Sequence, residues 1–322
     1  MPYKERLRKH GCPSQRKADY HVKNWSDYNQ ALKNRGSLTL WICQDIGDKW
    51  YARKSSSSQK GRPYYYSDYA ITIMLALRTM LKQKLRQIQG FVASLFALMG
   101  LTLDVPDYTR LSRRGTVALL TCQLDKMHEP GHLVIDSTGI KVYGESKWLE
   151  SKHGKHYKRK LWRKLHIGIN EEGLIVSRMM TDHRVDDRSC LQDHLRQADS
   201  TKVTELIADS GYDGQETYDQ LELANIKPII PPARGSPSTA GEAVSPRQET
   251  VNYIDKKGKY AWQSKNKYGR RAKVENTMYR YKEIIGRKLN ARLWNNQDAE
   301  LHLGCFILNT FIKLGMPKSA KM

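Results

Sequence analysis

Apolar residues recur at helical spacing from residue 67 onward, after a first stretch that has no regular pattern. A first helix begins at Ser67 or Asp68, either of which can cap it. Its inward positions, three or four residues apart, are Ile71, Met74, Leu75 and Leu81. A second helix runs from about Leu85 to near Gly100, with inward positions at Ile88, Val92, Leu95 and Met99. The pattern predicts a mainly helical N-terminal region.

A third, basic helix follows Pro106 and Asp107 in the stretch D-Y-T-R-L-S-R-R. Its exposed polar residues are Thr109, Arg110, Ser112, Arg113 and Arg114. Three short helices with a basic, hydroxyl-rich last helix resemble a helix-turn-helix, whose last helix enters the major groove of DNA. We therefore expect residues 67–118 to bind DNA through Arg110, Arg113 and Arg114. Three-helix packing without DNA binding is the alternative.

Between residues 132 and 233 the pattern changes to short strands that alternate with helices. The predicted strands are 132–142, 165–170, 174–180, 205–208 and 226–230, and the predicted helices are 188–197 and 215–224. The turn E-E-G joins the second and third strands as a hairpin. Pro228 removes a hydrogen-bond donor from the last strand, which predicts that this strand lies at the edge of the sheet.

The predicted elements form a mixed α/β sheet, in the order β-β-β-α-β-α-β-α. This order resembles the ribonuclease-H-like fold. In that fold the first and fourth strands are neighbours, so Asp136 and Asp209 would stand side by side. Two acids on adjacent strands repel each other unless a cation lies between them. Two-metal phosphoryl-transfer sites use this arrangement, and Mg²⁺ suits it. The alternative for Asp136 is a carboxylate that caps the turn at 137–139.

Asp213 competes with Asp209 as the second acid in the stretch A-D-S-G-Y-D-G-Q-E. Asp213 and Glu216 have the spacing of an N-cap with an acid three residues later, which gives Asp213 a structural explanation. Asp209 follows directly on a predicted strand. We therefore prefer Asp209 as the metal ligand.

Four polar residues of the segment 268–282 share one helix face. Tyr268, Arg271, Glu275 and Lys282 fall within about 60° of arc at 100° per residue. One interpretation is a solvated face on which Arg271 pairs with Glu275. The other is that Glu275 joins Asp136 and Asp209, which leaves Arg271 to contact a phosphate. The presence of two further strand-end acids favours the second interpretation.

The charge balance indicates a polyanionic partner. The 322 residues include 55 Lys and Arg against 33 Asp and Glu, a net charge of +22, which points first to nucleic acid and second to an anionic membrane. The most apolar uncharged run, 90–103, is shorter than the ~20 residues that span a bilayer. The N-terminal sequence has no apolar core of a signal peptide, so we expect a cytoplasmic protein.

Two segments concentrate this positive charge. Residues 151–170 contain seven Lys and Arg and no acid, and 251–282 contain ten Lys and Arg with only Asp255 and Glu275 as acids. Basic loops of this kind contact phosphates. A metal site at Glu150, His153 and His156 is the alternative, but no further ligand completes a recognised spacing. The five cysteines form no C-x-x-C pair, which argues against a zinc cage and a disulfide framework.

A Gly-, Ser- and Pro-rich stretch at 235–246 marks an excursion from the sheet. Residues 251–254 and 260–263 then suggest a hairpin around D-K-K-G-K. The expected organisation is a basic, mainly helical DNA-binding region at 1–128 and a catalytic domain at 129–322. A loop and hairpin insertion at about 234–266 interrupts that domain.

Several motifs now match a known family. The spacing Tyr268-x2-Arg271-x3-Glu275-x6-Lys282 is similar to the Y-R-E-K signature of bacterial insertion-sequence transposases of the DDE class. The first and second acidic motifs of the insertion sequence five group resemble V-I-D-S-T-G around Asp136 and A-D-S-G-Y-D around Asp209. The likeness extends through W-R-K-L-H and I-I-P-P-A-R and covers residues 130–316.

This resemblance implies a transposase with Asp136, Asp209 and Glu275 as catalytic ligands of two Mg²⁺ ions, for which Mn²⁺ can substitute. It implies cleavage at the terminal inverted repeats and transfer of the 3′-OH end into target DNA, with Tyr268, Arg271 and Lys282 on the DNA. The expected assembly on DNA is a homodimer, at the bacterial nucleoid and without a membrane. A ribonuclease-H-like nuclease or resolvase without strand transfer, and a non-catalytic DNA-binding regulator, are the alternatives.

Overall fold

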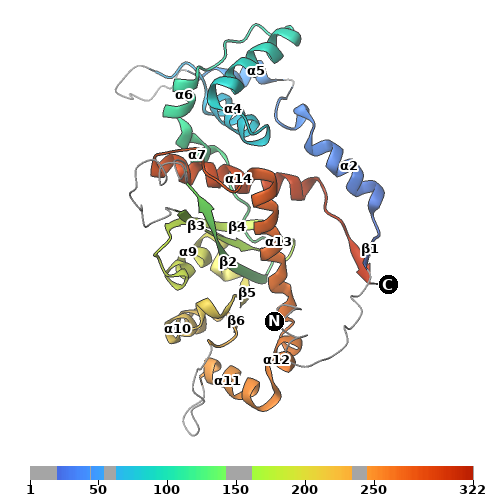
Figure 1. The fold of residues 1–322 in the computed structure, drawn as a ribbon, viewed down its shortest axis with the longest axis vertical. Coiled ribbons are helices and arrows are strands. Elements are labelled where there is room, and N and C mark those ends of the chain that lie inside the picture. Colours follow the sequence, from blue (N-terminus) through green and yellow to red (C-terminus); the bar gives the residue numbers. More distant parts are fainter. Residues whose placement is uncertain (1–19, 44, 54–62, 143–161, 234–244, 322) are drawn as a thin grey trace, which may run out of the picture. The chain divides into compact units, whose positions relative to one another are not determined.

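The computed structural model describes residues 20–43, 45–53, 63–142, 162–233 and 245–321 (Figure 1). The chain forms two compact units. The smaller unit combines the residues up to Leu40 with those from Phe311 onward, and the larger unit comprises Trp41–Thr310.

The smaller unit joins the two ends of the chain. Strand β1 (Tyr20–Val22) pairs antiparallel with β7 (Ser319–Lys321), and helix α2 (Trp25–Arg35) follows β1. A short 3₁₀ turn, η1 (Leu38–Leu40), comes next, and Arg35 Nη2 donates to the carbonyl oxygen of Gly315 at 2.8 Å. The sequence pattern does not indicate α2, because Ala31 is its one buried residue and leaves no apolar stripe.

The helices of residues 67–118 largely follow the prediction. They are α4 (Asp68–Met80), α5 (Leu85–Leu98), α6 (Tyr108–Arg113), η2 (Gly115–Val117) and the start of α7 (Ala118–Thr121). Helix α3 (Ile46–Trp50) precedes them and was not predicted. The hydroxyl of Ser67 caps α4 by accepting from the amide of Ala70 at 3.0 Å. Leu81 and Met99 are exposed, contrary to prediction, because each lies just beyond the last residue of its helix.

A five-stranded mixed sheet forms the centre of the larger unit. Its strands are β2 (Gly131–Lys141), β3 (Trp162–Ile169), β4 (Ile175–Asp182), β5 (Val203–Ile207) and β6 (Lys227–Ile229), in the order β4-β3-β2-β5-β6. The pairs β2–β3 and β3–β4 are antiparallel, whereas β2–β5 and β5–β6 are parallel. This order confirms the ribonuclease-H-like α/β fold, with Pro228 on the edge strand β6.

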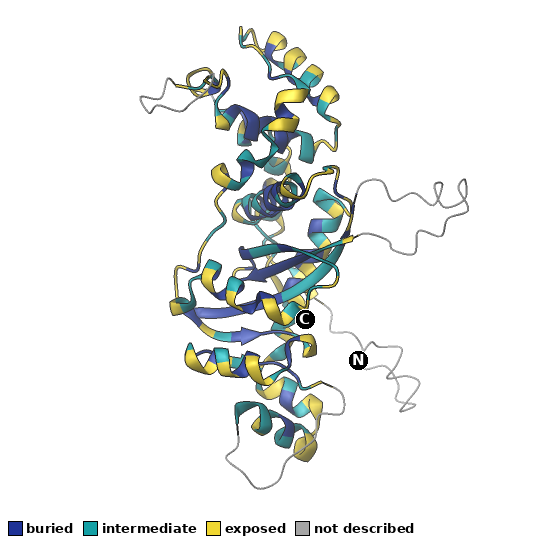
Figure 2. Cartoon of the chain, turned by 90° about the vertical axis from the view of Figure 1, so that its left-hand side faces the viewer, coloured by how far each residue is buried: buried dark blue, intermediate teal, exposed yellow. Residues whose placement is uncertain are grey.

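Helices cover both faces of the sheet, and buried residues concentrate along its strands (Figure 2). Helices α9 (Leu191–Ala198) and α10 (Gln215–Leu223) pack on one face with Leu133 and Ile135 of β2. Helices α13 (Ala272–Arg280) and α14 (Trp294–Leu314) pack on the other face with Val134. Alternation along β2 therefore decides which side chains face α13. Between strands lie the 3₁₀ turns η3 (Asp187–Cys190) and η4 (Ser200–Lys202).

Two helices occupy the segment predicted as a hairpin, and that prediction is wrong. Helix α11 (Pro246–Lys257) is capped by Ser245, and α12 (Lys259–Lys265) follows it. Gly258, at φ +85°, separates them within the predicted D-K-K-G-K turn. The helical form buries Val251 and Trp262 in the core, with Trp262 at 3% exposure. Burial of these two side chains stabilises the helices, whereas an isolated hairpin would have no core in which to bury them.

Some predictions fall on residues outside the described ranges. These are the basic loop up to residue 161 with Glu150, His153 and His156, and most of the 235–246 excursion. Cys122, Cys190 and Cys305 are buried, as expected for ordinary cysteines. Among the described helices, none combines the length and the apolar character that a membrane crossing requires. The boundary between residues 128 and 129 stays a prediction.

Candidate active site

Asp136, on β2, and Asp209, two residues beyond the end of β5, lie at the same level of the sheet. Val134 of β2 pairs with Ile207 of β5, so the residues two positions further along each strand direction are Asp136 and Asp209. Asp136 Oδ1 accepts from the amide of Ser137, and Asp209 Oδ1 accepts from the amide of Gly211, both at 2.8 Å. The second contact caps the 3₁₀ turn η5 (Ser210–Tyr212).

A single guanidinium joins these two acids to Glu275. Arg271 Nη2 lies 2.9 Å from Asp136 Oδ2 and 3.7 Å from Asp209 Oδ2. Its Nη1 atom forms an ion pair with Glu275 Oε1 in the first turn of α13. The three acids that the sequence singles out therefore converge on Arg271. The Arg271–Glu275 ion pair, which the sequence interpretation set aside, is present.

Burial makes the charged form of Asp136 costly. The carboxyl group is largely enclosed, and this desolvation raises its pKa to about 6, although Arg271 acts in the opposite direction. The charges of Asp209 and Glu275 raise the pKa further. By contrast, the side chains of Asp209 and Glu275 are 40% and 54% exposed. The site thus has one enclosed acid and two open ones.

The donor atoms of the site are of the kind that a divalent cation prefers. Three carboxylates supply the oxygen ligands that Mg²⁺ prefers, and the guanidinium among them shows that positive charge is stabilised at this position. The described residues contain no group of three or more His, Cys, Asp or Glu side chains close enough to form a metal cage. The carboxylates are instead arranged around Arg271.

Tyr268, in the turn that precedes α13, is hydrogen-bonded to the residue that follows the end of β5. Its hydroxyl donates to the carbonyl oxygen of Ala208 at 3.1 Å, directly before Asp209. Its ring lies 5.3 Å from the buried ring of Trp262. Burial raises the pKa of Tyr268 to about 12, so the phenol stays neutral and remains a donor. This contact positions Asp209 relative to Arg271.

Lys282 reaches the same strand from the far end of the segment. Its Nζ atom donates to Thr138 Oγ1 at 2.5 Å, two residues beyond Asp136. The sequence analysis assumed that this segment is one regular α-helix, and that assumption is wrong. The 3₁₀ turn η6 (Tyr268–Arg271) precedes α13, and the π-helical turn η7 (Tyr281–Ile285) follows it. Arg271, Glu275 and Lys282 nevertheless all face the sheet near Asp136.

Asp213 has a structural role, but not the predicted one. It does not cap α10, whose N-cap is Gly214. Its carboxylate accepts from Arg247 Nε at 2.8 Å, from Arg247 Nη2 at 2.9 Å and from the amide of Ala233 at 2.8 Å. The carboxylate therefore joins α11 to the segment after β6, and of the two candidate acids Asp209 is the one at Arg271.

Asp187 is a neighbour of the site that the sequence analysis did not single out. Its Oδ2 atom accepts from Ser137 Oγ at 2.7 Å and its Oδ1 atom accepts from Lys164 Nζ at 2.8 Å. Ser137 directly follows Asp136. The only sequence signal is the acid pair Asp186–Asp187 before a predicted helix, and such pairs are common at helix starts.

The three N-terminal arginines differ in their environments. Arg114 is mostly enclosed, donates to the carbonyl oxygen of Tyr66 at 2.6 Å and pairs with Asp68. Arg110 is exposed and forms an ion pair with Asp107 at 3.2 Å. Arg113 is exposed at the end of α6. Arg114 thus packs the helices together, and Arg110 and Arg113 present charge to solvent.

Two family models and one solved structure are similar to this chain. A family model described as "Transposase DDE domain" matches residues 127–310, more than half of the chain. A second model with the same description matches residues 33–145. A cryo-EM structure of a piggyBac transposase synaptic complex with hairpin DNA is similar at 10% sequence identity and a TM-score of 0.39. The match covers 88% of this chain and 74% of that one.

Proposed function

Because the chain belongs to the DDE transposase domain family, whose members are phosphoryl-transfer enzymes acting on DNA, we propose that it is the transposase of a bacterial insertion sequence. It binds the terminal inverted repeats, cuts a DNA strand at the end of the element and transfers the freed 3′-OH end into target DNA. The observation that carries this proposal is the convergence of Asp136, Asp209 and Glu275 on Arg271.

The three carboxylates are the ligands of a pair of Mg²⁺ ions, and Mn²⁺ can replace them. When bound, such ions supply charge neutralisation at the phosphate and an activated attacking oxygen. Asp136 is rigidly placed on β2 between its neighbours in the sheet, so it defines the position of the site. Asp209 and Glu275 are open to solvent, so a phosphate can approach the ions that these carboxylates would hold. Such preorganisation is the main contribution of a protein to phosphoryl transfer.

Arg271 and Lys282 contact the DNA phosphates on either side of the scissile bond. Arg271 is a planar donor that pairs with carboxylates in the DNA-free protein and can pair with a phosphate in the complex. Lys282 is held by Thr138, two residues along β2 from Asp136. Tyr268 keeps Asp209 in place through Ala208, and the exposed part of its ring can lie against a sugar or base.

The remaining partners follow from the charge and the fold. The N-terminal region, 1–128, binds double-stranded DNA at the terminal repeats through Arg110 and Arg113 of the helix-turn-helix-like residues 67–118. The catalytic domain is 129–322. A homodimer holds the two ends of the element together, and the enzyme works in the bacterial cytoplasm at the nucleoid. The net charge of +22 supports a DNA partner.

The decisive experiment measures binding, cleavage and joining on one DNA substrate. The variants Asp136→Asn, Asp209→Asn and Glu275→Gln are expected to lose Mg²⁺-dependent cleavage by at least a hundredfold while they retain DNA binding. Asp193→Asn, on the exposed outer side of α9, is the matched control and should keep full activity. Normal cleavage by any of the three variants would contradict the assignment. Cleavage without joining of 3′-OH ends would identify a nuclease or resolvase instead.

A further inference from the structure

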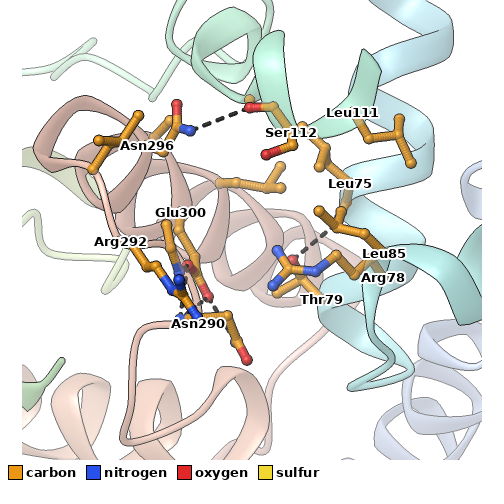
Figure 3. A pocket seen from close by; sticks show the side chains of 15 residues that line it. Leu75, Arg78, Thr79, Leu85, Leu111, Ser112, Asn290, Arg292, Asn296 and Glu300 are labelled. Carbon is orange, nitrogen blue, oxygen red and sulfur yellow. Dashed lines mark hydrogen bonds between the residues drawn. The ribbon is translucent and has the colours of Figure 1, made fainter. Parts of the chain in front are cut away.

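Two adjoining cavities lie between the end of α4, with the turn that follows it, and the segment 286–293, and the larger one is also lined by α6 and α14. Their volumes are about 400 Å³ and 260 Å³, and both are lined by Arg78, Thr79, Asn290 and Glu300. In Figure 3, Arg78 and Thr79 of α4 face Asn290 and Arg292 across the larger cavity. The two cavities therefore form one continuous groove, which we call the basic groove.

The basic groove is lined by positive charge from both sides. Its cations are Arg78, Lys82, Lys84, Arg287, Lys288 and Arg292. Its one acid, Glu300, accepts from the amides of Asn290 at 3.0 Å and Ala291 at 2.9 Å, so this carboxylate holds the backbone of the loop. Because Arg287 also pairs with Glu283, the six cations face two carboxylates, and this excess of positive charge attracts a polyanion.

The basic groove is connected to the carboxylates along β2. The amide of Lys141 donates to the carbonyl oxygen of Arg287 at 3.1 Å, and the amide of Leu289 donates to that of Lys141 at 2.8 Å. From Asp136 to Lys141 is five residues of extended strand, roughly 16 Å. That distance corresponds to about five base pairs of B-DNA at 3.4 Å per step. Lys282, bonded to Thr138, lies between the two ends of this path.

We propose that the basic groove binds the sugar-phosphate backbone of the DNA duplex about five base pairs from the bond that is cut. This inference rests on the proposed function, because that function supplies the scissile bond at Asp136. It assigns to DNA binding a set of cations that does not include Arg110 and Arg113. Lys82 and Lys84 in the α4–α5 turn are exposed, so their replacement tests the surface without disturbing the core.

The test compares two double variants with equal loss of charge. Lys82→Gln/Lys84→Gln should bind a labelled DNA duplex about tenfold more weakly and lower the slope of log K against log salt by about 1.8. The control Lys126→Gln/Lys202→Gln removes lysines beside Asp199, before the starts of β2 and β5, and should leave both unchanged. Equal effects of the two variants overturn the proposal. Binding is measured without divalent cations and therefore does not depend on cleavage. A failure to cleave in a separate assay with Mg²⁺ would count against the proposed function and not against the basic groove.

A second inference concerns Asp187, which lies behind the site. Successive side chains of β2 point to opposite faces, so Ser137 faces away from Arg271 whereas Asp136 faces toward it. Asp187 accepts from the hydroxyl of Ser137, and the amide of Ser137 donates to Asp136. Lys164 of β3 holds the other oxygen of Asp187. The structure assigns Asp187 as a positioning residue that orients the Asp136 carboxylate through Ser137.

The test follows Mn²⁺ binding by electron paramagnetic resonance beside the kinetics of cleavage. Asp187→Ala should weaken Mn²⁺ binding and lower kcat about tenfold with KM for DNA unchanged, as loss of such a supporting contact does. Asp187→Asn keeps an acceptor for Ser137 and should restore part of the loss. Ser137→Ala should match Asp187→Ala, and the double variant should be no worse than either. Losses that multiply, or a lower melting temperature with Mn²⁺ binding unchanged, overturn the assignment.

Discussion

Arg271 Nη2 donates to Asp136 Oδ2 at 2.9 Å and thereby joins two residues that are 135 positions apart in the chain. The contact holds the turn before α13 against β2 and brings Glu275 close to Asp136 and Asp209. It also means that a positive side chain lies where the proposed function requires divalent cations. The ionic state of this cluster therefore connects protein stability, metal binding and DNA binding.

Replacing Arg271 with Gln removes the cation from among three carboxylates. Their mutual repulsion should then favour metal uptake, so the DNA-free protein should bind Mn²⁺ about tenfold more tightly, a gain of ~1.4 kcal/mol. DNA affinity should fall, and the salt slope should decrease by about one contact. Calorimetric titration with Mn²⁺ and anisotropy with DNA measure both effects. Unchanged Mn²⁺ affinity would show that Arg271 does not compete with the metal.

The raised pKa of Asp136 makes stability depend on pH. The folded value is about 6 against an ordinary 3.8, so the unfolded state releases this proton more easily, and the protein loses stability as pH rises from about 4 through 6. Asp136→Asn cannot ionise and escapes this loss. In urea denaturation with a chelator, the variant should exceed the unsubstituted protein by on the order of 2 kcal/mol at pH 8. The difference should shrink toward pH 4, and a difference that grows there would contradict the cause.

Asp209 and Asp213 should separate by their effects on stability. The Asp213 side chain is fully enclosed and accepts from Arg247 and from the amide of Ala233, so Asp213→Ala leaves these donors without their carboxylate and should cost about 1–3 kcal/mol. Asp209→Asn changes an exposed group and should alter the free energy of unfolding by less than about 0.5 kcal/mol. Chemical denaturation of both variants measures the contrast. A stable Asp213→Ala protein would remove the structural role.

The adjacent residues Arg113 and Arg114 provide another matched pair. Arg114→Ala removes the bond to the Tyr66 carbonyl and the ion pair with Asp68, and should destabilise the helices by about 2–3 kcal/mol. Arg113→Ala should leave the melting temperature unchanged and reduce the salt slope of DNA binding by about one. Melting curves and anisotropy on the two proteins are sufficient. Equal salt slopes for Arg113→Ala and the unsubstituted protein would remove Arg113 from the DNA surface.

The sequence pattern was sufficient to predict those features that depend on residues close together in the chain. The cap at Ser67, the hairpin of β3 and β4, and the edge position of Pro228 each follow from spacing or from one residue's chemistry, and all are confirmed. The segment 246–265 failed because Val251 and Ile254 fit a short strand and one helical turn equally well. Packing of Val251 and Trp262 in the core resolves that ambiguity, and short sequence windows do not contain it.

The order of elements already placed Asp136 beside Asp209, since the ribonuclease-H-like topology makes their strands neighbours. Tertiary structure alone decided that Arg271 lies among all three acids, that Asp213 belongs to Arg247, and that Arg114 is enclosed. The physical reason is the sequence separation of the residues that interact. Caps and hydrophobic periodicity involve residues a few positions apart, so residue spacing reveals them. Burial and charge pairing depend on which distant side chains the folded sheet brings together.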